Sequence, residues 1–102
     1  MPFPFSNLGG VKRRPVLVLS STPFNAAQED VIVCQITSNI ALDGYSVPLM
    51  PEDLVAGMLK APSRIKPYRI TALDQKLLGK QIGKISEEKF IETLKMLNRV
   101  ME

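Results

Sequence analysis

Short apolar runs, each closed by proline, glycine or turn-forming polar residues, make up most of the chain. Residues 15–19 form one such run, which stops at Ser20-Ser21-Thr22-Pro23, and residues 30–37 form a second around Val31-Ile32-Val33-Cys34. Valine, leucine and isoleucine in runs of this length, bounded by chain breakers, favour buried strands over helices. The pattern therefore predicts two buried strands at 15–19 and 30–37.

Weaker signals predict the later elements. Asp43-Gly44 indicates a tight turn, and Pro48 restricts residues 45–49 to a strand at the edge of a sheet. Breakers divide the rest into a helical turn at 52–59, an interrupted strand at 63–70, a helical turn at 74–78 and a strand at 81–85. We expect a loop at 24–29, and at 1–10 a loop that leads away from a short extended piece.

The clearest predicted element is a helix at the C-terminus. Ser86 is a favourable N-cap, and Glu87 and Glu88 follow in the first turn, where the helix dipole favours negative charge. Helical spacing places several apolar side chains on one stripe, which we expect to pack on the core: Phe90, Ile91, Leu94, Leu97 and Met101. Many short strands followed by one helix favour a mostly antiparallel sheet curled into a small β-barrel, a single α+β domain of residues 1–102.

The composition limits the classes of function. Hydrophobic residues make up 45% of the 102 residues and charged residues 23%, as in an ordinary soluble domain, and the net charge is +3. This mild basic excess permits a nucleic-acid or an acidic protein partner but demands neither. No apolar run approaches the roughly 20 residues of a membrane helix. The N-terminus also lacks a signal-peptide pattern, so we expect a cytoplasmic protein without membrane contact.

The residue types that carry most enzyme chemistry are scarce. The chain has no histidine and a single cysteine, Cys34. This excludes an intramolecular disulfide, a serine–histidine triad and the commonest metal ligand, so we expect neither a metal site nor a cofactor. Cys34 lies inside an apolar run, which favours a buried structural residue over a nucleophile.

Four segments in series resemble the MazF/PemK family of toxins. Residues 2–8 and then Lys12-Arg13-Arg14-Pro15-Val16-Leu17-Val18-Leu19-Ser20 match its opening, in which a glycine-rich loop precedes an Arg-Pro pair and a strand ending in serine. The strand ending in Ile36-Thr37-Ser38, residues 63–66 with 70–74, and residues 81–86 match its later blocks in order. No single block is specific, but together they cover nearly the whole chain.

The resemblance implies both a fold and an activity. The fold would be an SH3-like barrel with a C-terminal helix, assembled as a homodimer. The activity would be that of a type II toxin, a metal-independent endoribonuclease that cuts single-stranded RNA or mRNA selectively and inhibits growth. In the family the 2′-hydroxyl of the RNA attacks the adjacent phosphorus and leaves a cyclic phosphate. A cognate acidic antitoxin protein would block the site.

The resemblance also implies that Arg14 and Thr37 are the catalytic pair. Cleavage needs charge stabilisation on the phosphorane, and the planar fork of arginine fits non-bridging phosphate oxygens. Arg14 lies where a loop enters a rigid strand and Thr37 ends the next strand, so we expect both side chains to face one groove. The alternatives are that Arg14 is a solvated surface cation and that the Thr37 hydroxyl bonds to nearby backbone.

Six further residues are candidate RNA contacts: Lys12, Arg13, Ser38, Asn39, Lys66 and Tyr68. The two basic residues before Arg14 would attract phosphates and make binding sensitive to salt. Lys66 corresponds to a basic position of the family, and Tyr68 offers a face for base stacking. Turn, surface or core roles stay open for the last four residues.

The chain departs from the family pattern at two points. Family members begin with a full strand before the Pro-Phe segment, and this sequence starts where that strand would end, which leaves open whether the barrel lacks the family's first strand. Some members carry a glutamate in the loop before Arg-Pro that has been proposed as a base. Residues 7–12 contain no carboxylate, so the general base is unidentified.

Two alternative functions stay open. The same fold serves a non-catalytic toxin that inhibits DNA gyrase through protein contact. Apolar residues late in the C-terminal helix would suit such a protein binder: Met96, Val100 and Met101. The other alternative is a truncated, inactive relative of the family.

Overall fold

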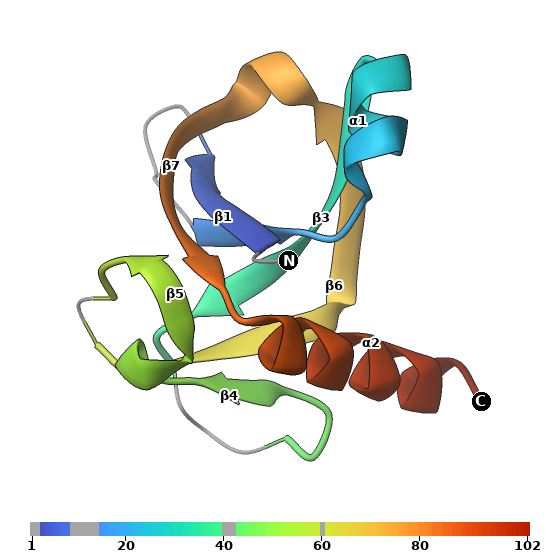
Figure 1. Cartoon of the computed structure of the whole chain (residues 1–102). Helices are drawn as coiled ribbons and strands as arrows, with labels where there is room; N and C mark the ends of the chain where they lie inside the picture. The colour runs from blue at the N-terminus through green and yellow to red at the C-terminus, as the bar shows by residue number, and fades with distance from the viewer. Residues whose placement is uncertain (1–2, 9–14, 40–42, 60) are drawn as a thin grey trace.

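A seven-stranded antiparallel sheet curls into a half-open barrel, and a C-terminal helix packs against it (Figure 1). The structure, a computed structural model, describes residues 3–8, 15–39, 43–59 and 61–102. In chain order the elements are β1 (Phe3–Leu8), β2 (Pro15–Val18), α1 (Thr22–Ala27), β3 (Asp30–Thr37), β4 (Val47–Leu49), the 3-10 turn η1 (Pro51–Asp53), β5 (Leu54–Gly57), β6 (Ser63–Asp74), the 3-10 turn η2 (Gln75–Leu77), β7 (Leu78–Ile85) and α2 (Glu87–Met101). The strands lie in the order β4-β6-β3-β2-β1-β7-β5.

The two apolar runs of the sequence form β2 and β3, which are buried on both faces. Leu17 and Cys34 belong to one cluster of buried side chains, and Val16 and Val33 belong to a second cluster. A strand that is covered on both faces has an apolar residue at successive positions instead of alternate ones. The prediction of two buried strands is therefore confirmed.

β1 lies in the middle of the sheet, between β2 and β7. Phe5 pairs with Leu17 on one side and with Gly83 on the other. The extended piece expected near the start of the sequence is thus a strand of six residues. β4 forms one edge of the sheet, as Pro48 predicted, and the strand expected at 81–85 is the second half of β7.

Two predicted elements are wrong. Residues 24–29, expected to be a loop, largely belong to helix α1, because the Ser21 hydroxyl caps it by accepting a hydrogen bond from the backbone nitrogen of Phe24 (3.4 Å). Residues 52–59, expected to be a helical turn, are mostly extended. Only η1 is helical there, and Leu54–Gly57 is strand β5 paired with β7. Pairing across the sheet overrides local propensity in this segment.

Helix α2 begins after Ser86 as predicted, but the stripe expected to pack on the core is only partly buried. Phe90 is buried, whereas three members of the stripe are largely exposed: Ile91 (44%), Leu94 (41%) and Met101 (77%). Thr93 takes their place on the buried face, and its hydroxyl donates to the backbone oxygen of Lys89 (2.8 Å). A threonine whose hydroxyl is satisfied within its own helix can be buried at little cost. None of the helices in the described ranges is long and apolar enough to span a membrane.

β6 contains a bulge opposite the middle of β3. Gln35 of β3 pairs with Lys66 of β6, but the preceding residue Cys34 pairs with Ile70. Residues 67–69 are therefore additional to the ladder, and they begin with Pro67, which cannot donate a ladder hydrogen bond. Extra residues of this kind bend a strand and change the direction in which its side chains point.

Gly57, at the end of β5, is a position where the structure leaves no room for a side chain. Its φ is +84°, and an added Cβ would overlap the backbone of Ile82 and Gly83 in β7. We expect Gly57→Ala to lower the free energy of unfolding by about 2–4 kcal/mol, because left-handed strain and overpacking act together.

Gly44 provides the matched control. Its φ is +79°, but nothing lies within 4 Å of an added Cβ. Gly44→Ala should therefore cost only the strain, about 1 kcal/mol. Urea unfolding of both variants measures the difference, and equal losses would show that the contact with β7 has no energetic weight.

Candidate functional site

The start of β2 and the end of β3 lie at the same end of the sheet. The two strands are antiparallel neighbours, and Val16 pairs with Gln35. Pro15 is the first residue of β2, and Thr37 is the last residue of β3. Pro15 lies one residue before Val16 and Thr37 lies two residues after Gln35, both toward the same end of the sheet.

Three of the predicted site residues, Lys12, Arg13 and Arg14, lie outside the described residues. Arg14 directly precedes Pro15 in the sequence. The chain therefore joins Arg14 to the strand end beside Thr37.

The Thr37 hydroxyl makes the backbone contact that is common at strand ends. Its Oγ1 accepts a hydrogen bond from the backbone nitrogen of Asn39 (3.1 Å). Thr37 is half-buried, whereas Ser38 and Asn39 are exposed. A hydroxyl has one donor and two acceptor positions, so this bond leaves the Thr37 proton for a second partner. A phosphate oxygen at the strand end would be a suitable acceptor.

Two basic residues of β6 pair with the end of β3 but differ in what they contact. Arg64 pairs with Thr37, and its guanidinium donates to Ser46 twice, from Nε to the hydroxyl (2.6 Å) and from Nη2 to the backbone oxygen (3.0 Å). Lys66 pairs with Gln35 and is half-buried. Its ammonium forms no hydrogen bond or ion pair with another residue in the described part of the chain. Arg64 therefore holds the segment that leads into β4, and Lys66 is the cation available to a ligand.

Tyr68 lies in a different place from Thr37. Its hydroxyl donates to Oδ2 of Asp43 (2.5 Å), and this hydrogen bond is the main reason why the pKa of Asp43 is held well below its usual range. Tyr68 lines a hollow of about 380 Å³ together with Arg99 and Val100, at the C-terminal end of α2. The structure thus brings Tyr68 together with α2 and not with the end of β3.

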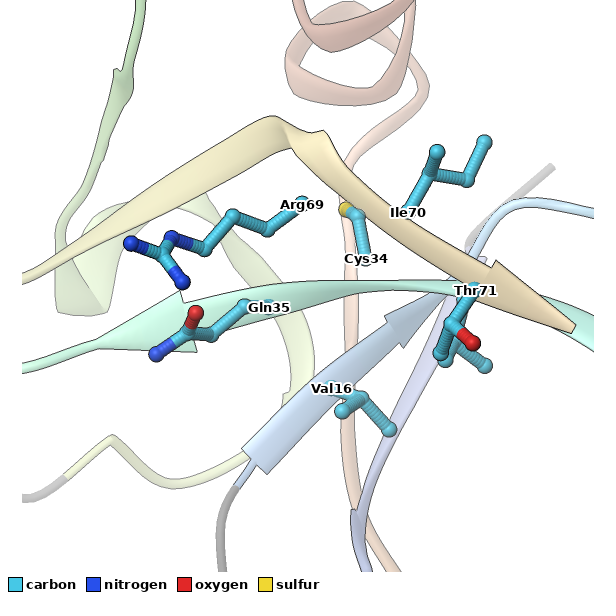
Figure 2. Close-up of a pocket in the computed structure, with 7 residues that line it drawn as sticks. Val16, Cys34, Gln35, Arg69, Ile70 and Thr71 are labelled. Carbon is cyan, nitrogen blue, oxygen red and sulfur yellow. The ribbon is translucent and has the colours of Figure 1, made fainter. Parts of the chain in front are cut away.

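A second hollow, of about 340 Å³, lies between β2, β3 and the bulge of β6 (Figure 2). Val16 and Val33 contribute apolar surface, and Gln35, Arg69 and Thr71 contribute polar groups. Figure 2 shows the side chains of Gln35 and Arg69 extending in the same direction, toward the end of β3. Gln35, which lines this hollow, precedes Thr37 by two residues on β3.

Gln35 and Arg69 are candidate functional residues that the sequence reasoning missed. Gln35 is the one polar residue between Val31 and Ile36, and this interruption of a buried run was a usable signal. Arg69 lines the hollow beside Gln35 because of the additional residues in β6, and no local pattern indicates that shift of register.

Cys34 also borders this hollow, but its thiol is unsuited to nucleophilic chemistry. Cys34 is 0% exposed, and burial raises the pKa of its thiol to about 12. A thiol with so high a pKa is protonated at neutral pH, and the thiolate is the reactive form. The prediction of a buried structural cysteine is confirmed. Within the described ranges, no three histidine, cysteine, aspartate or glutamate side chains gather in a way that could hold a metal ion.

Solved structures of toxins share this architecture over almost the whole chain. Toxin MazF-mt6 from Mycobacterium tuberculosis has a TM-score of 0.81 at 24% identity, with 96% of this chain and 95% of that chain covered. An endoribonuclease from mycobacterial species, in complex with its cognate antitoxin, has a TM-score of 0.81 at 17% identity, with 96% and 90% covered. A chain of the MazE–MazF complex from Deinococcus radiodurans has a TM-score of 0.76 at 21% identity, with 98% and 90% covered. These likenesses confirm the predicted MazF/PemK-like barrel with a C-terminal helix.

The family follows from the amino-acid sequence itself. A comparison with curated protein sequences gives no match. The family model for the PemK-like, MazF-like toxin of type II toxin–antitoxin systems, however, matches residues 3–101. That span runs from the first residue of β1 to the last residue of α2. The chain therefore belongs to the PemK-like, MazF-like family of toxins of type II toxin–antitoxin systems.

Proposed function

We propose that this toxin is a metal-independent, sequence-selective endoribonuclease that cleaves single-stranded RNA, including mRNA, in the cytoplasm. The observation that carries the proposal is the antiparallel pairing of β2 with β3, which puts Thr37 at the end of the sheet where Pro15 begins β2. Arg14 precedes Pro15, so its guanidinium and the Thr37 hydroxyl can act on one phosphate. Family membership supports the same activity.

The proposed reaction is an internal transesterification. The 2′-oxygen of the ribose forms a bond to the adjacent phosphorus, and the bond from phosphorus to the 5′-oxygen of the next nucleotide breaks. The products are a 2′,3′-cyclic phosphate and a free 5′-hydroxyl. Arg14 stabilises the added negative charge on the non-bridging oxygens. The Thr37 hydroxyl donates a hydrogen bond to the same phosphate and keeps its proton, because its oxygen already accepts a hydrogen bond from the backbone nitrogen of Asn39.

Water is the proposed carrier of both protons. The chain has no histidine, and residues 7–12 contain no carboxylate. The guanidinium of Arg14 stays protonated in proteins and so cannot accept the proton of the 2′-hydroxyl. We therefore assign the stabilisation of charge and the positioning of the phosphate to Arg14 and Thr37. We assign both proton transfers to water.

Charge elsewhere on the chain favours an RNA ligand. Lys66 lies on β6 beside Gln35 without an anionic partner in the described part of the chain. Lys12 and Arg13 precede Arg14 in the sequence, and the net charge of the chain is +3. Contacts between such cations and phosphates release counterions, so binding should weaken as the salt concentration rises.

A cognate antitoxin and a second copy of the chain are the proposed protein partners. One structural relative is an endoribonuclease in complex with its cognate antitoxin, and another is MazF with MazE. The positive net charge of this chain would complement an acidic antitoxin. A barrel of this size also gains stability by dimerising, because its surface is large relative to its volume.

The exposed apolar residues of α2 favour a second candidate function, a non-catalytic protein binder such as a gyrase inhibitor. Ile91, Leu94 and Met101 present apolar surface to solvent. Inhibition of gyrase by the purified protein, without any cleavage of RNA, would select this alternative.

Removal of the Arg14 guanidinium tests the proposed function most directly. We expect the parent protein to cut single-stranded RNA in EDTA, and we expect Arg14→Ala to lower the rate at least about 100-fold, since it removes the main source of charge stabilisation. Arg99→Ala is the matched control, because Arg99 is an exposed arginine on α2. An Arg14→Ala protein that is folded, by circular dichroism, and cuts as fast as the parent would show that the site is elsewhere.

The role of the Thr37 hydroxyl is tested by Thr37→Val, which keeps the shape of the side chain and removes the donor. We expect the rate to fall about 10- to 100-fold, with the larger effect on kcat, because the hydroxyl acts on the reacting phosphate. Thr22→Val is the control, since Thr22 is exposed at the start of α1, away from the end of β3. An unchanged kcat in Thr37→Val would show that the hydroxyl has no role in catalysis and serves only its contact with the backbone of Asn39.

The antitoxin proposal predicts a short, acidic reading frame immediately upstream of this one. Its product should co-purify with the toxin and stop RNA cleavage at an equimolar ratio, because it covers the site. Size-exclusion chromatography and a cleavage assay on the same mixture measure both effects. A product that binds while cleavage continues would contradict the proposed mode of inhibition.

A further inference from the structure

We propose that the hollow between β2, β3 and the bulge of β6 binds one base of the RNA substrate, and that Gln35 and Arg69 select which base it accepts. The inference rests on the proposed RNA cleavage and adds to it the residues that read sequence. Four features of the hollow support the inference: its shape, its polar groups, its charge and its position.

The shape and lining of the hollow suit a single unstacked base. Its volume of about 340 Å³ falls within the range of small-ligand sites. Val16 and Val33 line it and are 4% and 0% exposed, so this part of its wall is held firmly in the core. Proteins that recognise unstacked RNA bases stack them on aromatic rings or on arginine guanidinium planes, and Arg69 supplies such a plane.

The polar groups of the hollow are those that recognise base edges. The Gln35 amide both donates and accepts, and the Arg69 guanidinium only donates, which are the patterns that pair with adenine and guanine edges respectively. Neither side chain forms a hydrogen bond or ion pair with another described residue. Because both line the hollow and extend in the same direction (Figure 2), one base edge can meet both groups.

The charge of the hollow favours a nucleotide and distinguishes it from the hollow beside α2. Among the described residues no carboxylate lines the hollow at the bulge of β6, and Arg69 gives it a positive charge. The hollow beside α2 contains Arg99, but also the carboxylates of Asp43 and Glu102. An RNA strand carries one negative charge for each nucleotide, so of these two hollows the one at the bulge of β6 is complementary to it.

The position of the hollow places a bound base next to the proposed cleavage site. Gln35 and Thr37 lie two residues apart on β3 and therefore point to the same face of the sheet. Their separation along the strand is about 7 Å, which is two residues of strand rise. A phosphate held at Thr37 can thus have the base of a neighbouring ribose in the hollow.

The test is a map of cut sites on a long single-stranded RNA of natural sequence, digested in EDTA by the whole protein and sequenced from the new 5′ ends. Gln35→Leu and Arg69→Gln remove the proposed reading groups. We expect the base preference at one position flanking the cut to fall by roughly 5- to 150-fold in these variants, the discrimination of one good bidentate contact. Preferences at the other positions should be retained. Arg99→Gln is the matched control and should keep the parent's map.

Each outcome has a defined meaning. If both variants cut the same sites with the parent's preferences, the inference is wrong and the proposed function stands. A uniform loss of rate at all sites would also overturn the inference, because it would assign Arg69 to general attraction of phosphates. If the parent protein cuts no RNA, the proposed function fails and the base site fails with it. Urea unfolding checks that the variants are folded, and Arg69→Gln, at an exposed position, keeps the test decisive if Gln35→Leu is unstable.

Discussion

The pairing of β3 with β2 on one edge and with β6 on the other is the interaction on which the rest of the structure depends. Val33 and Cys34 are adjacent in the sequence, yet each is fully buried in a different cluster of the core. A slip of one residue would exchange the two faces along the whole strand. The core therefore sets the register of β3, and the register sets where Thr37 lies. Thr37 is therefore positioned by the core and needs few contacts of its own at the strand end.

The chemistry available at this site is that of charge and position. The chain has no histidine, and the Cys34 thiol has a pKa of about 12, so the described residues near the end of β3 include no side chain that exchanges protons readily at neutral pH. An arginine and a threonine keep the same protonation state over the physiological range. They suit a reaction in which the substrate supplies its own nucleophile, because the enzyme then needs only to hold a phosphate and stabilise its added charge.

Local patterns in the sequence predicted the buried strands, the N-cap of α2 and the fold class, because each of these depends on neighbouring residues. Long-range packing decided the rest. Thr93 and not Ile91 faces the sheet, since a threonine hydroxyl can be satisfied within its own helix. Tyr68 was grouped with Thr37 on its chemistry alone, but its hydroxyl bonds to Asp43 and its ring lies beside α2. Arg69 was missed because its place depends on a shift of register between two strands.

The bulge of β6 separates the residues that fix the position of Thr37 from the residues that line the hollow. The residues on either side of it are constrained by the core: Ile65 and Cys34 are 0% exposed, and their pairs fix the end of β3. Within the bulge and just after it, Arg69 and Ile70 are exposed and border the hollow. We expect substitutions there to alter the wall of the hollow while the core keeps the register that positions Thr37. On the proposal that the hollow binds a base, such a fold can change the base that it accepts and retain the geometry proposed to hold the phosphate.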